Sequence, residues 1–453
     1  MLEDRVFGIV GLGKSGRAVL EFLTKRGIKV IAIDDNLDLE MLKNKYPKGV
    51  EFYDMHIPDD VLDSIDLLVV SPGVSLSHPV VKKVSDGKKE IMGEMELAYR
   101  YKKDGYIVAV TGTNGKTTTS YIISDILKTW GKNTVLAGNV GTPFISVIDR
   151  DYDFIVLEVS SFQLETISAF KPDMAILLNA SEDHIDRHGS RETYFDIKKR
   201  IFKNQCKEDT AILNQDDARI RALSDVLVSK VFLFGEGKRY RNTYAYISDD
   251  EIVIHGEKKD LRININRLRN RARPFIYNMM AGTLAASVLG APYDAIEKVA
   301  YSFTPLPHRM EYVDTIGGVE FINDSKATNP DAVFWALSTF PNHSVILIMG
   351  GKDKNLSFEK IRDILDKKVK SLILMGQARE KLNRVLSFSP TYVVDSMKEA
   401  VEIAYKIAQK GDRVLLSPGC TSWDMYKNFE ERGEDFKNCV KRLKERNNEG
   451  TGA

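Results

Sequence analysis

Short apolar runs alternate with amphipathic helical patterns along almost the whole chain. The first run, Val6–Val10, leads into a glycine turn at Gly11–Gly16, and a helical pattern with one apolar face follows it. This alternation is typical of an α/β protein whose sheets are mostly parallel. Between about Thr210 and Asn266 the helical patterns give way to short β-type runs, which predict an extension of a sheet.

The chain has 453 residues, and its length suggests about three domains. We place one boundary near Gly93, after a charged stretch, and a second near Ser302. The predicted domains are 1–93, 94–302 and 303–453. The last of these contains four predicted strands, at Val319–Ile322, Val345–Met349, Leu372–Met375 and Val414–Leu416.

Charge and composition exclude some classes of protein. Lys and Arg number 65 and Asp and Glu 64, so the net charge is +1. This balance argues against a protein that coats nucleic acid. It does not exclude small anionic substrates, because local fields matter more than net charge.

Targeting and redox signals indicate a cytoplasmic protein. The N-terminus has no basic segment before a long apolar run, so we expect no signal peptide. No stretch of about 18 apolar residues occurs, and we therefore predict no membrane span. The cysteines, Cys206, Cys420 and Cys439, are widely separated. That spacing fits a reducing compartment and offers no set of metal ligands.

The stretch VTGTNGKTTTS, from Val110 to Ser120, follows an apolar strand and opens a helix. Consecutive backbone N–H groups and a helix N-terminus at such a junction bind anions, and glycines let the backbone approach closely. Lys116 is expected to neutralise terminal phosphates, and Thr117 or Thr118 to offer a hydroxyl to Mg²⁺. The loop departs from Walker A spacing, because Val110 occupies the place of the first glycine. The alternative is a simple glycine turn.

Two later strand ends carry polar groups. Glu158 ends the apolar run Phe154–Leu157, and a carboxylate at the carboxyl end of a parallel strand faces the crevice where ligands bind. We expect it to hold a magnesium ion. The run Met174–Leu178 leads into a loop with two histidines and three carboxylates. His184 in that loop is equally compatible with a functional site and with an ordinary polar loop.

Lys198 lies on a predicted helix that Ser190 caps. Tyr194, Ile197 and Ile201 form the apolar face of this helix. At about 100° per residue Lys198 falls inside that face. A desolvated lysine amine is more easily neutral and nucleophilic. The alternative is a lysine that extends its ammonium group to the surface.

These features, with others in the same order, resemble the Mur ligases of peptidoglycan synthesis over nearly the whole chain. Within that family the resemblance is greatest to members that add D-glutamate to UDP-N-acetylmuramoyl-L-alanine. The matching motifs are TGTNGKTTT from Thr111, GNVG from Gly138, EVSSFQLE from Glu158, NASEDHIDRH from Asn179, LPHRME from Leu306, NDSKATNP from Asn323, and LLSPGCTSWDMYKNFEERG from Leu415.

The resemblance implies an α/β fold of three domains. A Rossmann-like N-terminal domain would bind the UDP part of the substrate, a central P-loop-type ATPase domain would bind ATP, and a Rossmann-like C-terminal domain would bind the amino acid. It also implies a reaction. The substrate carboxylate attacks the ATP γ-phosphate, which gives an acyl phosphate and ADP, and the amine of D-glutamate then displaces phosphate. We expect a cytoplasmic monomer without nucleic-acid or membrane partners.

The resemblance assigns the nucleotide and metal residues. The catalytic residues would be Lys116, Glu158, His184 and Lys198. Two Mg²⁺ ions would be held by Thr117, Glu158, His184 and Lys198, the last as a carbamate derived from CO₂. ATP would be bound by Gly112, Thr113, Asn114, Gly115, Lys116, Thr117, Thr118, Asn278, Arg309, Asp324 and Lys326.

The other two substrates have their own predicted sites. The UDP substrate would be bound by Gly11, Gly13, Lys14, Ser15, Gly16, Asp34, Asp35, Ser71, Gly73, Asn139, Gln163 and His184. D-glutamate would be bound by Thr328, Lys354, Ser422 and Phe429, which follow three predicted strands and should therefore lie at one edge of the sheet.

The chain departs from the family pattern near Asn278. The family often has His before this Asn and another Asn three residues after it, whereas here those positions are Tyr277 and Ala281. The packing around adenine is therefore an open question.

Three other interpretations remain. One is a related ligase with another acceptor, such as a folylpolyglutamate synthase, although the UDP-type N-terminal segment argues against it. Another is a nicotinamide-dependent oxidoreductase, because the Gly11–Gly16 turn followed by Asp34 is close to the dinucleotide fingerprint. The third is a non-catalytic nucleotide-binding scaffold, which would leave Lys116, Glu158 and Lys198 without a joint purpose.

Overall fold

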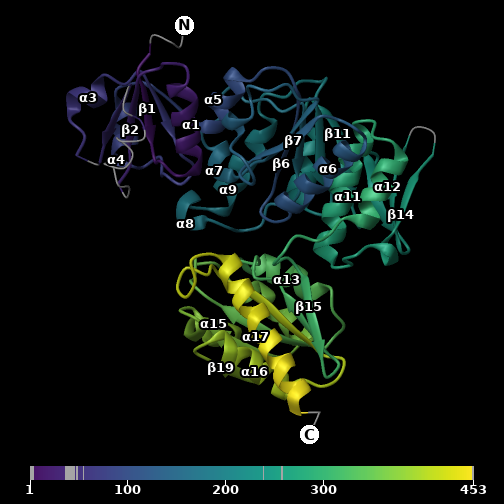
Figure 1. Ribbon diagram of the computed structural model, residues 1–453. Helices are drawn as coiled ribbons and strands as arrows, with labels where there is room; N and C mark the ends of the chain where they lie inside the picture. The colour runs from purple at the N-terminus through teal and green to yellow at the C-terminus, as the bar shows by residue number, and fades with distance from the viewer. Residues whose placement is uncertain are drawn as a thin grey trace.

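The computed structural model describes residues 5–35, 46, 49–54, 56–237, 239–256 and 259–450. Within these residues the strands form three separate sheets. Figure 1 shows the N-terminal domain beside the central domain, with the C-terminal domain below both, so that the two chain termini lie at opposite ends. The predicted α/β class with three domain bodies is confirmed.

The N-terminal sheet has the strand order β3-β2-β1-β4-β5, and its neighbouring strands are all parallel. Strands β1 and β4 are buried at every position, which explains why they are continuous apolar runs rather than alternating ones. The strands are β1 (Phe7–Val10), β2 (Val30–Ile33), β3 (Val50–Tyr53), β4 (Leu67–Val70) and β5 (Glu90–Gly93), and the helices are α1 (Lys14–Thr24), α3 (Asp59–Asp63) and α4 (Pro79–Asp86).

The central sheet has the order β14-β13-β12-β11-β10-β9-β6-β8-β7. It is parallel from β7 to β12, and β13 and β14 add an antiparallel edge, which confirms the predicted extension. The strands are β6 (Tyr106–Thr111), β7 (Thr134–Gly138), β8 (Phe154–Glu158), β9 (Met174–Leu177), β10 (Thr210–Asn214), β11 (Lys230–Gly235), β12 (Thr243–Ser248), β13 (Glu251–Ile254) and β14 (Leu261–Asn264).

The helices of the central domain cover both faces of this sheet. They include α11, which packs against α6 beside the strands that carry the predicted site. The α-helices are α5 (Glu94–Tyr101), α6 (Lys116–Thr129), α7 (Ser161–Leu164), α8 (Ile185–His188), α9 (Arg191–Lys199), α10 (Ala218–Arg221), α11 (Arg273–Val288) and α12 (Tyr293–Ser302). Short 3₁₀ turns occupy η2 (Phe144–Ser146), η3 (Arg200–Phe202), η4 (Ala222–Asp225) and η5 (Ile265–Arg267).

The C-terminal sheet has the order β15-β16-β20-β17-β18-β19, in which only the β15–β16 pair is antiparallel among the described strands. The predicted strands are confirmed, each a little longer than its apolar run. The elements are β15 (Glu311–Ile316), β16 (Val319–Asn323), α13 (Pro330–Ser338), β17 (Val345–Gly350), η6 (Glu359–Ile361), α14 (Arg362–Lys368), β18 (Val369–Met375), α15 (Arg379–Leu386), β19 (Thr391–Val393), α16 (Met397–Ile407), β20 (Arg413–Gly419) and α17 (Phe429–Gly450).

The two seams between domains differ in chemistry. One continuous apolar cluster runs from β1 through α5 into the central sheet. Buried Glu96 fixes α5 on the central domain by accepting the backbone N–H groups of Ser168, Ala169 and Phe170. The seam with the C-terminal domain instead depends on polar pairs, among them Lys354 with Asp183 and Lys360 with Glu182. The first seam buries apolar area, whereas ion pairs cross the second.

No helix in the described part of the chain is both long enough and apolar enough to span a bilayer.

Candidate active site

The predicted phosphate loop joins β6 to α6 at the carboxyl edge of the central sheet. Gly115 is the N-cap of α6, has φ +88°, and places no side chain over the first helical N–H groups. A Cβ at this position would overlap the amide oxygen of Asn278 on α11. Asn179 clamps the loop from β9, because it accepts the N–H of Asn114 at 2.8 Å and donates to the carbonyl of Asn114 at 3.0 Å. The loop is thus preformed, and the first N–H groups of α6, which have no acceptor within the helix, face the place where an anion can bind.

Two lysines lie against this loop. The Nζ of Lys116 donates to the carbonyl oxygens of Gly112 and Thr113, at 2.9 and 3.0 Å. The Nζ of Lys198 donates to the same Gly112 oxygen at 2.9 Å and lies 4.6 Å from the ring centroid of Tyr194. Lys198 is only 1% exposed, so the predicted burial is confirmed and the surface alternative is wrong. Burial, and then the charge of Lys116, holds the pKa of Lys198 well below its ordinary value.

Two further cations line the cleft from the C-terminal domain. Within the described residues, the Nε of Arg309 is buried and has no hydrogen-bond partner. The Nζ of Lys326 lies 4.0 Å from the ring centroid of Phe429. Burial, followed by the charges of Arg309 and Lys116, lowers the pKa of Lys326 to about 8. Burial also lowers the pKa of Lys116, and Arg309 adds to that effect. Arg309 therefore disfavours the charged form of both lysines, a repulsion that a polyanion bound here would offset.

Glu158, at the end of β8, has the environment of a metal ligand. It is 2% exposed, and its Oε1 accepts the amide of Asn139 at 2.7 Å. Its Oε2 is buried without a hydrogen-bond partner among the described residues. Nowhere in the described part of the chain do three or more His, Cys, Asp or Glu side chains gather. The buried, unpartnered Oε2 of Glu158 fits Mg²⁺, which proteins often bind through one or two carboxylates together with substrate phosphates and water.

The loop between β9 and α9 reaches all three domains. His184 adopts the left-handed conformation, with φ 54°, and its ring lies edge-on to Phe162 with centroids 4.8 Å apart. Its neighbour Asp183 accepts the Nζ of Lys354 at 3.0 Å across the domain seam. Burial would raise the pKa of Asp183, but the charges of Lys354 and His184 outweigh it and lower that pKa. At the other end of the loop Arg187 donates to the carbonyl of Val74 in the N-terminal domain.

The glycines of the N-terminal turn differ in whether the backbone conformation and the surrounding space would allow a side chain. Gly11 has φ +84°, and a Cβ on Gly16 would overlap the carbonyl oxygen of Gly11, so both are sterically required. A Cβ on Gly13 would meet nothing within 4 Å. Asp34 accepts the backbone N–H of Leu12 at 2.6 Å, which places its carboxylate beside the turn.

The other residues predicted for the UDP substrate lie around this turn or on the central domain. Ser71 donates to the Gly11 carbonyl at 2.6 Å, and Asp35 lies 3.6 Å from the Nε2 of His78. Lys14 donates to the carbonyl of Gly141 in the central domain. The side-chain oxygen of Gln163 accepts the N–H of Ser160 in a capping box, so that oxygen is already used. Ser15, Gly73 and Asn139 are also present at this seam, the first two in the N-terminal domain and the last beside Glu158.

The three loops predicted for D-glutamate do meet at one edge of the C-terminal sheet. Lys352 and Thr421 exchange backbone hydrogen bonds of 2.8 and 3.1 Å, and the N–H of Gly419 donates to the carbonyl of Ala327 at 2.8 Å. These contacts gather the segments that carry the predicted residues, which are Thr328, Lys354, Ser422 and Phe429.

Arg432 ties the same loops together, and sequence reasoning missed it. It is 2% exposed, and its guanidinium donates to Ser325, Gly350 and Cys420. Burial lowers its pKa to about 10. An arginine in a charged helical segment gives no sign of burial, so periodicity did not reveal it.

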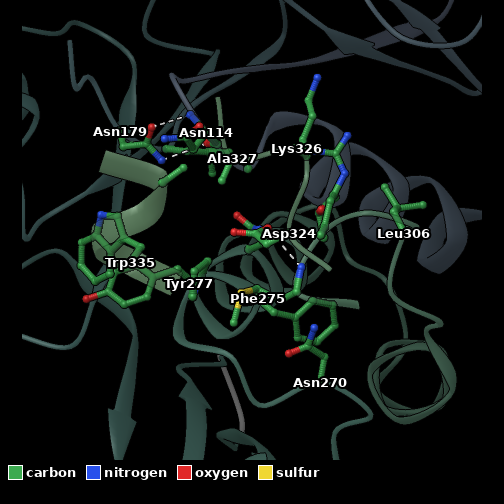
Figure 2. A pocket seen from close by; sticks show the side chains of 18 of the residues that line it. Asn114, Asn179, Asn270, Phe275, Tyr277, Leu306, Asp324, Lys326, Ala327 and Trp335 are labelled. Atoms are coloured by element: carbon green, nitrogen blue, oxygen red, sulfur yellow. Dashed lines mark hydrogen bonds between the residues drawn. The ribbon is translucent and has the colours of Figure 1, made fainter. Parts of the chain in front are cut away.

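A cleft lies between the loop and the C-terminal domain. It contains the predicted nucleotide residues Asn278, Arg309, Asp324 and Lys326. Burial raises the pKa of Asp324 to about 7, although Ser417 donates to it at 3.0 Å. Figure 2 shows that aromatic side chains occupy the side of the cleft opposite Lys326. Sequence reasoning did not assign three of the lining residues, Asn270, Phe275 and Trp335.

The fold and this geometry define a class, an enzyme of three α/β domains with a phosphate-binding loop facing a seam between domains. Family models match nearly every part of the chain. They describe a Mur ligase MurD-like N-terminal domain at residues 5–93, a Mur ligase middle domain at 110–286, and a Mur ligase glutamate ligase domain at 308–420. The chain belongs to the Mur ligase family.

Full-length relatives agree with these matches. The chain is 40% identical to the UDP-N-acetylmuramoylalanine–D-glutamate ligase of Caldanaerobacter subterraneus subsp. tengcongensis, with 98% of this chain and 99% of that protein covered. It is 37% identical to the ligase of the same name from Clostridioides difficile, with 98% and 100% covered. For Aquifex aeolicus the identity is 39%, with 96% and 98% covered.

Solved structures share the fold at lower identity. MurF ligase from Thermotoga maritima in complex with ADP aligns with a TM-score of 0.63 at 18% identity, covering 97% of this chain and 95% of that one. UDP-N-acetylmuramate–alanine ligase MurC from the same organism aligns with a TM-score of 0.59 at 18% identity, covering 97% and 100%.

Proposed function

We propose that this protein is an ATP-dependent ligase that adds D-glutamate to UDP-N-acetylmuramoyl-L-alanine in the synthesis of peptidoglycan precursors. The observation that carries the proposal is the group of cations around the phosphate loop. Burial lowers the pKa of both Lys116 and Lys326, the charge of Arg309 lowers both further, and the charge of Lys116 adds to the effect on Lys326. A bound triphosphate would remove that repulsion, which is the electrostatic requirement of an ATP site.

The phosphate loop and these cations would position the γ-phosphate for attack by the substrate carboxylate. Backbone N–H groups at Gly112–Lys116 would hold the phosphate oxygens, and Lys116 would exchange its two carbonyl contacts for them. Glu158 and the hydroxyl of Thr117 would bind Mg²⁺, which supplies charge neutralisation at the phosphates. Asn139 fixes the orientation of Glu158, since it donates to Oε1, while Oε2 has no hydrogen-bond partner among the described residues.

This step would give an acyl phosphate and ADP, and the acyl phosphate would then react with D-glutamate. The amine would attack the acyl carbon, the C–O bond to phosphate would break, and the amine would lose a proton. Thr328, Lys354, Ser422 and Phe429 would bind the amino acid. Lys354 already binds a carboxylate, that of Asp183, which supports its role in binding an acidic amino acid.

Lys198 would act as a carbamate in this proposal. Attack of a lysine on CO₂ needs a neutral amine, and the burial of Lys198 favours that form. The new carboxylate would join His184 in binding a second Mg²⁺.

The Gly11–Gly16 turn, with Asp34 and Asp35, would bind the UDP part. Its open amides suit a diphosphate, and a carboxylate accepts hydrogen bonds from uracil or ribose. A cytoplasmic location and a monomeric state are further parts of the proposal. All three cysteines are free, which fits a reducing compartment.

The test is nucleotide product analysis with UDP-N-acetylmuramoyl-L-alanine and a panel of amino acids. We expect ADP and phosphate, released only when both the nucleotide acid and D-glutamate are present. Release of AMP and pyrophosphate would contradict the acyl-phosphate mechanism. Tight NAD(H) binding at the N-terminal turn, with no binding of a UDP-sugar, would favour an oxidoreductase instead.

A further inference from the structure

The carboxyl group of Glu94 is buried at the seam between the N-terminal and central domains, and the proposed reaction does not use it. Glu94 is the first residue of α5 and is 1% exposed. Its Oε1 accepts the backbone N–H of Ile145 at 2.7 Å, and its Oε2 has no hydrogen-bond partner among the described residues. A buried carboxyl with an unpaired oxygen lowers the stability of the fold. This cost points to a role for Glu94 other than stability.

The N–H that Glu94 binds belongs to η2, at the end of the segment 138–146, which follows β7. This segment begins with a tight turn, because the N–H of Gly138 donates to the carbonyl of Thr142 at 2.9 Å. Gly138 has φ +102°, and a Cβ at this position would overlap the carbonyl oxygen of Glu158. After the turn, η2 packs against α1 and α5. The segment therefore lies against the end of β8 at one end and is bound by Glu94 at the other.

Asn139 lies in this turn and binds Glu158 through two hydrogen bonds. The backbone N–H of Asn139 donates to the carbonyl of Glu158 at 2.8 Å, and its side-chain amide donates to Oε1 at 2.7 Å. The Oε2 of Glu158 has no hydrogen-bond partner in the described part of the chain. The orientation of this carboxylate therefore depends on where the segment 138–146 is held.

The same segment contacts the N-terminal glycine turn. Lys14, the first residue of α1, donates to the carbonyl of Gly141. Lys14 belongs to the predicted UDP site, so a bound diphosphate would compete with this carbonyl for the ammonium group. The bond from Ile145 to Glu94 does not involve the UDP site, and it would continue to hold the segment when Lys14 turns to the substrate.

The protonation state of Glu94 does not change its capacity to accept this N–H. Burial raises the pKa of Glu94 to about 7, and the backbone N–H groups of Ile145 and Phe144 act in the opposite direction. Both the carboxylate and the neutral carboxylic acid have an oxygen that accepts a hydrogen bond. Glutamine offers such an oxygen too, whereas methionine has a similar length and only a weak acceptor.

We propose that Glu94 is a positioning residue of the ligation reaction. By accepting the N–H of Ile145 it fixes the segment 138–146, and through Asn139 it holds Glu158 in the orientation that binds Mg²⁺. The inference rests on the proposed function and adds to it a buried residue, outside the site itself, on which metal binding depends.

The test compares Glu94→Met with Glu94→Gln in the full chain. Glu94→Met should speed backbone hydrogen exchange across residues 138–146. It should also weaken the binding of Mn²⁺, used as a paramagnetic probe with ADP present, about 10-fold, or about 1.4 kcal/mol, which is the size of one hydrogen bond. In steady-state assays kcat should fall by a similar factor, while the KM for D-glutamate stays constant. Glu94→Gln should keep most of the wild-type exchange protection, Mn²⁺ affinity and kcat, because it keeps the acceptor.

Glu96→Gln is the matched control, because Glu96 is a second buried acceptor on α5 and binds the N–H groups of residues 168–170 instead. It should lower the melting temperature and leave Mn²⁺ binding unchanged. If Glu94→Met does not fold, Glu94→Ala removes the same acceptor and takes its place in the test.

Two outcomes would overturn the inference. One is that Glu94→Gln is as defective as Glu94→Met, and the other is that exchange across residues 138–146 rises without a loss of Mn²⁺ affinity. If the wild type forms ADP and phosphate as proposed, and the variants without the acceptor bind Mn²⁺ as tightly as it does, the inference fails and the proposed function stands. If the wild type neither binds Mn²⁺ with ADP nor cleaves ATP, both fail.

Discussion

Replacing Lys326 by Met should make the nucleotide-free protein more stable while it weakens ATP binding. The Nζ of Lys326 lies over the ring of Phe429, and burial with the charges of Arg309 and Lys116 lowers its pKa from 10.5 to about 8. This difference corresponds to about 3 kcal/mol of lost preference for the charged form. Methionine has a similar length and carries no charge, so the variant avoids this cost.

The same pKa determines the direction of the pH dependence. Between pH 8 and 10.5 the unfolded chain binds a proton at Lys326 that the folded protein has released, so the free energy of unfolding rises with pH in that window. Lys326→Met should lose this part of the rise. Bound phosphates favour the ammonium form, so ATP binding should take up protons near pH 8 and weaken as the pH rises further. A charge-assisted contact contributes about 1.5–3 kcal/mol, which predicts about 10-fold to 100-fold weaker ATP binding in the variant.

Calorimetry of ATP binding at pH 8, in two buffers with different ionisation enthalpies, measures the proton uptake. Thermal melting of the nucleotide-free protein measures the stability. Lys444→Met is the matched control, because Lys444 is an exposed lysine paired with Asp314 and far from the cleft. Wild-type ATP affinity in Lys326→Met, or equal proton uptake in both proteins, would refute the interpretation of the cation cluster as an ATP site.

Three further predictions concern the other sites. Labelled bicarbonate should give a carbamate carbon-13 signal in the wild type that disappears in Lys198→Ala, and full activity of unmodified Lys198 in CO₂-free buffer would contradict the role of the carbamate. Lys354→Ala should raise the KM for D-glutamate about 10-fold to 100-fold, or about 1.4–2.8 kcal/mol, and leave the KM for ATP nearly unchanged. If Lys354→Ala and Asp183→Asn instead weaken the binding of D-glutamate and of ATP equally, the ion pair serves only domain closure. Gly13→Ala should keep the melting temperature and weaken binding of the UDP substrate, because its Cβ points into open space. Gly16→Ala should instead lower the melting temperature, because its Cβ meets the Gly11 carbonyl. If Gly13→Ala binds the UDP substrate with wild-type affinity, the turn is not part of the site.

The sequence by itself determined the features that depend on local periodicity and backbone geometry. Buried parallel strands must be continuous apolar runs, so their positions could be read directly, as for β1 and β4. The phosphate loop was recognisable because an anion site at a helix N-terminus needs glycine, lysine and threonine at adjacent positions. Helical periodicity placed Lys198 on the apolar face of its helix but left open whether its ammonium group reaches the surface, which the structure decided in favour of burial. The N-cap role of Ser190 is confirmed by its bond to the Thr193 N–H.

Only the tertiary structure decided which distant groups meet and what charge they carry. The pairing of Asp183 with Lys354 joins residues 171 positions apart, and no local pattern favours one lysine over another as the partner. Trp335 reads as an ordinary helix residue until α13 is placed against α11 at the cleft. The pKa of Lys326 depends on burial and on Arg309 and Lys116, which come from different domains. The electrostatic potential that determines this pKa is the sum of contributions from charges in the whole folded molecule. It exists only after folding has brought those charges together.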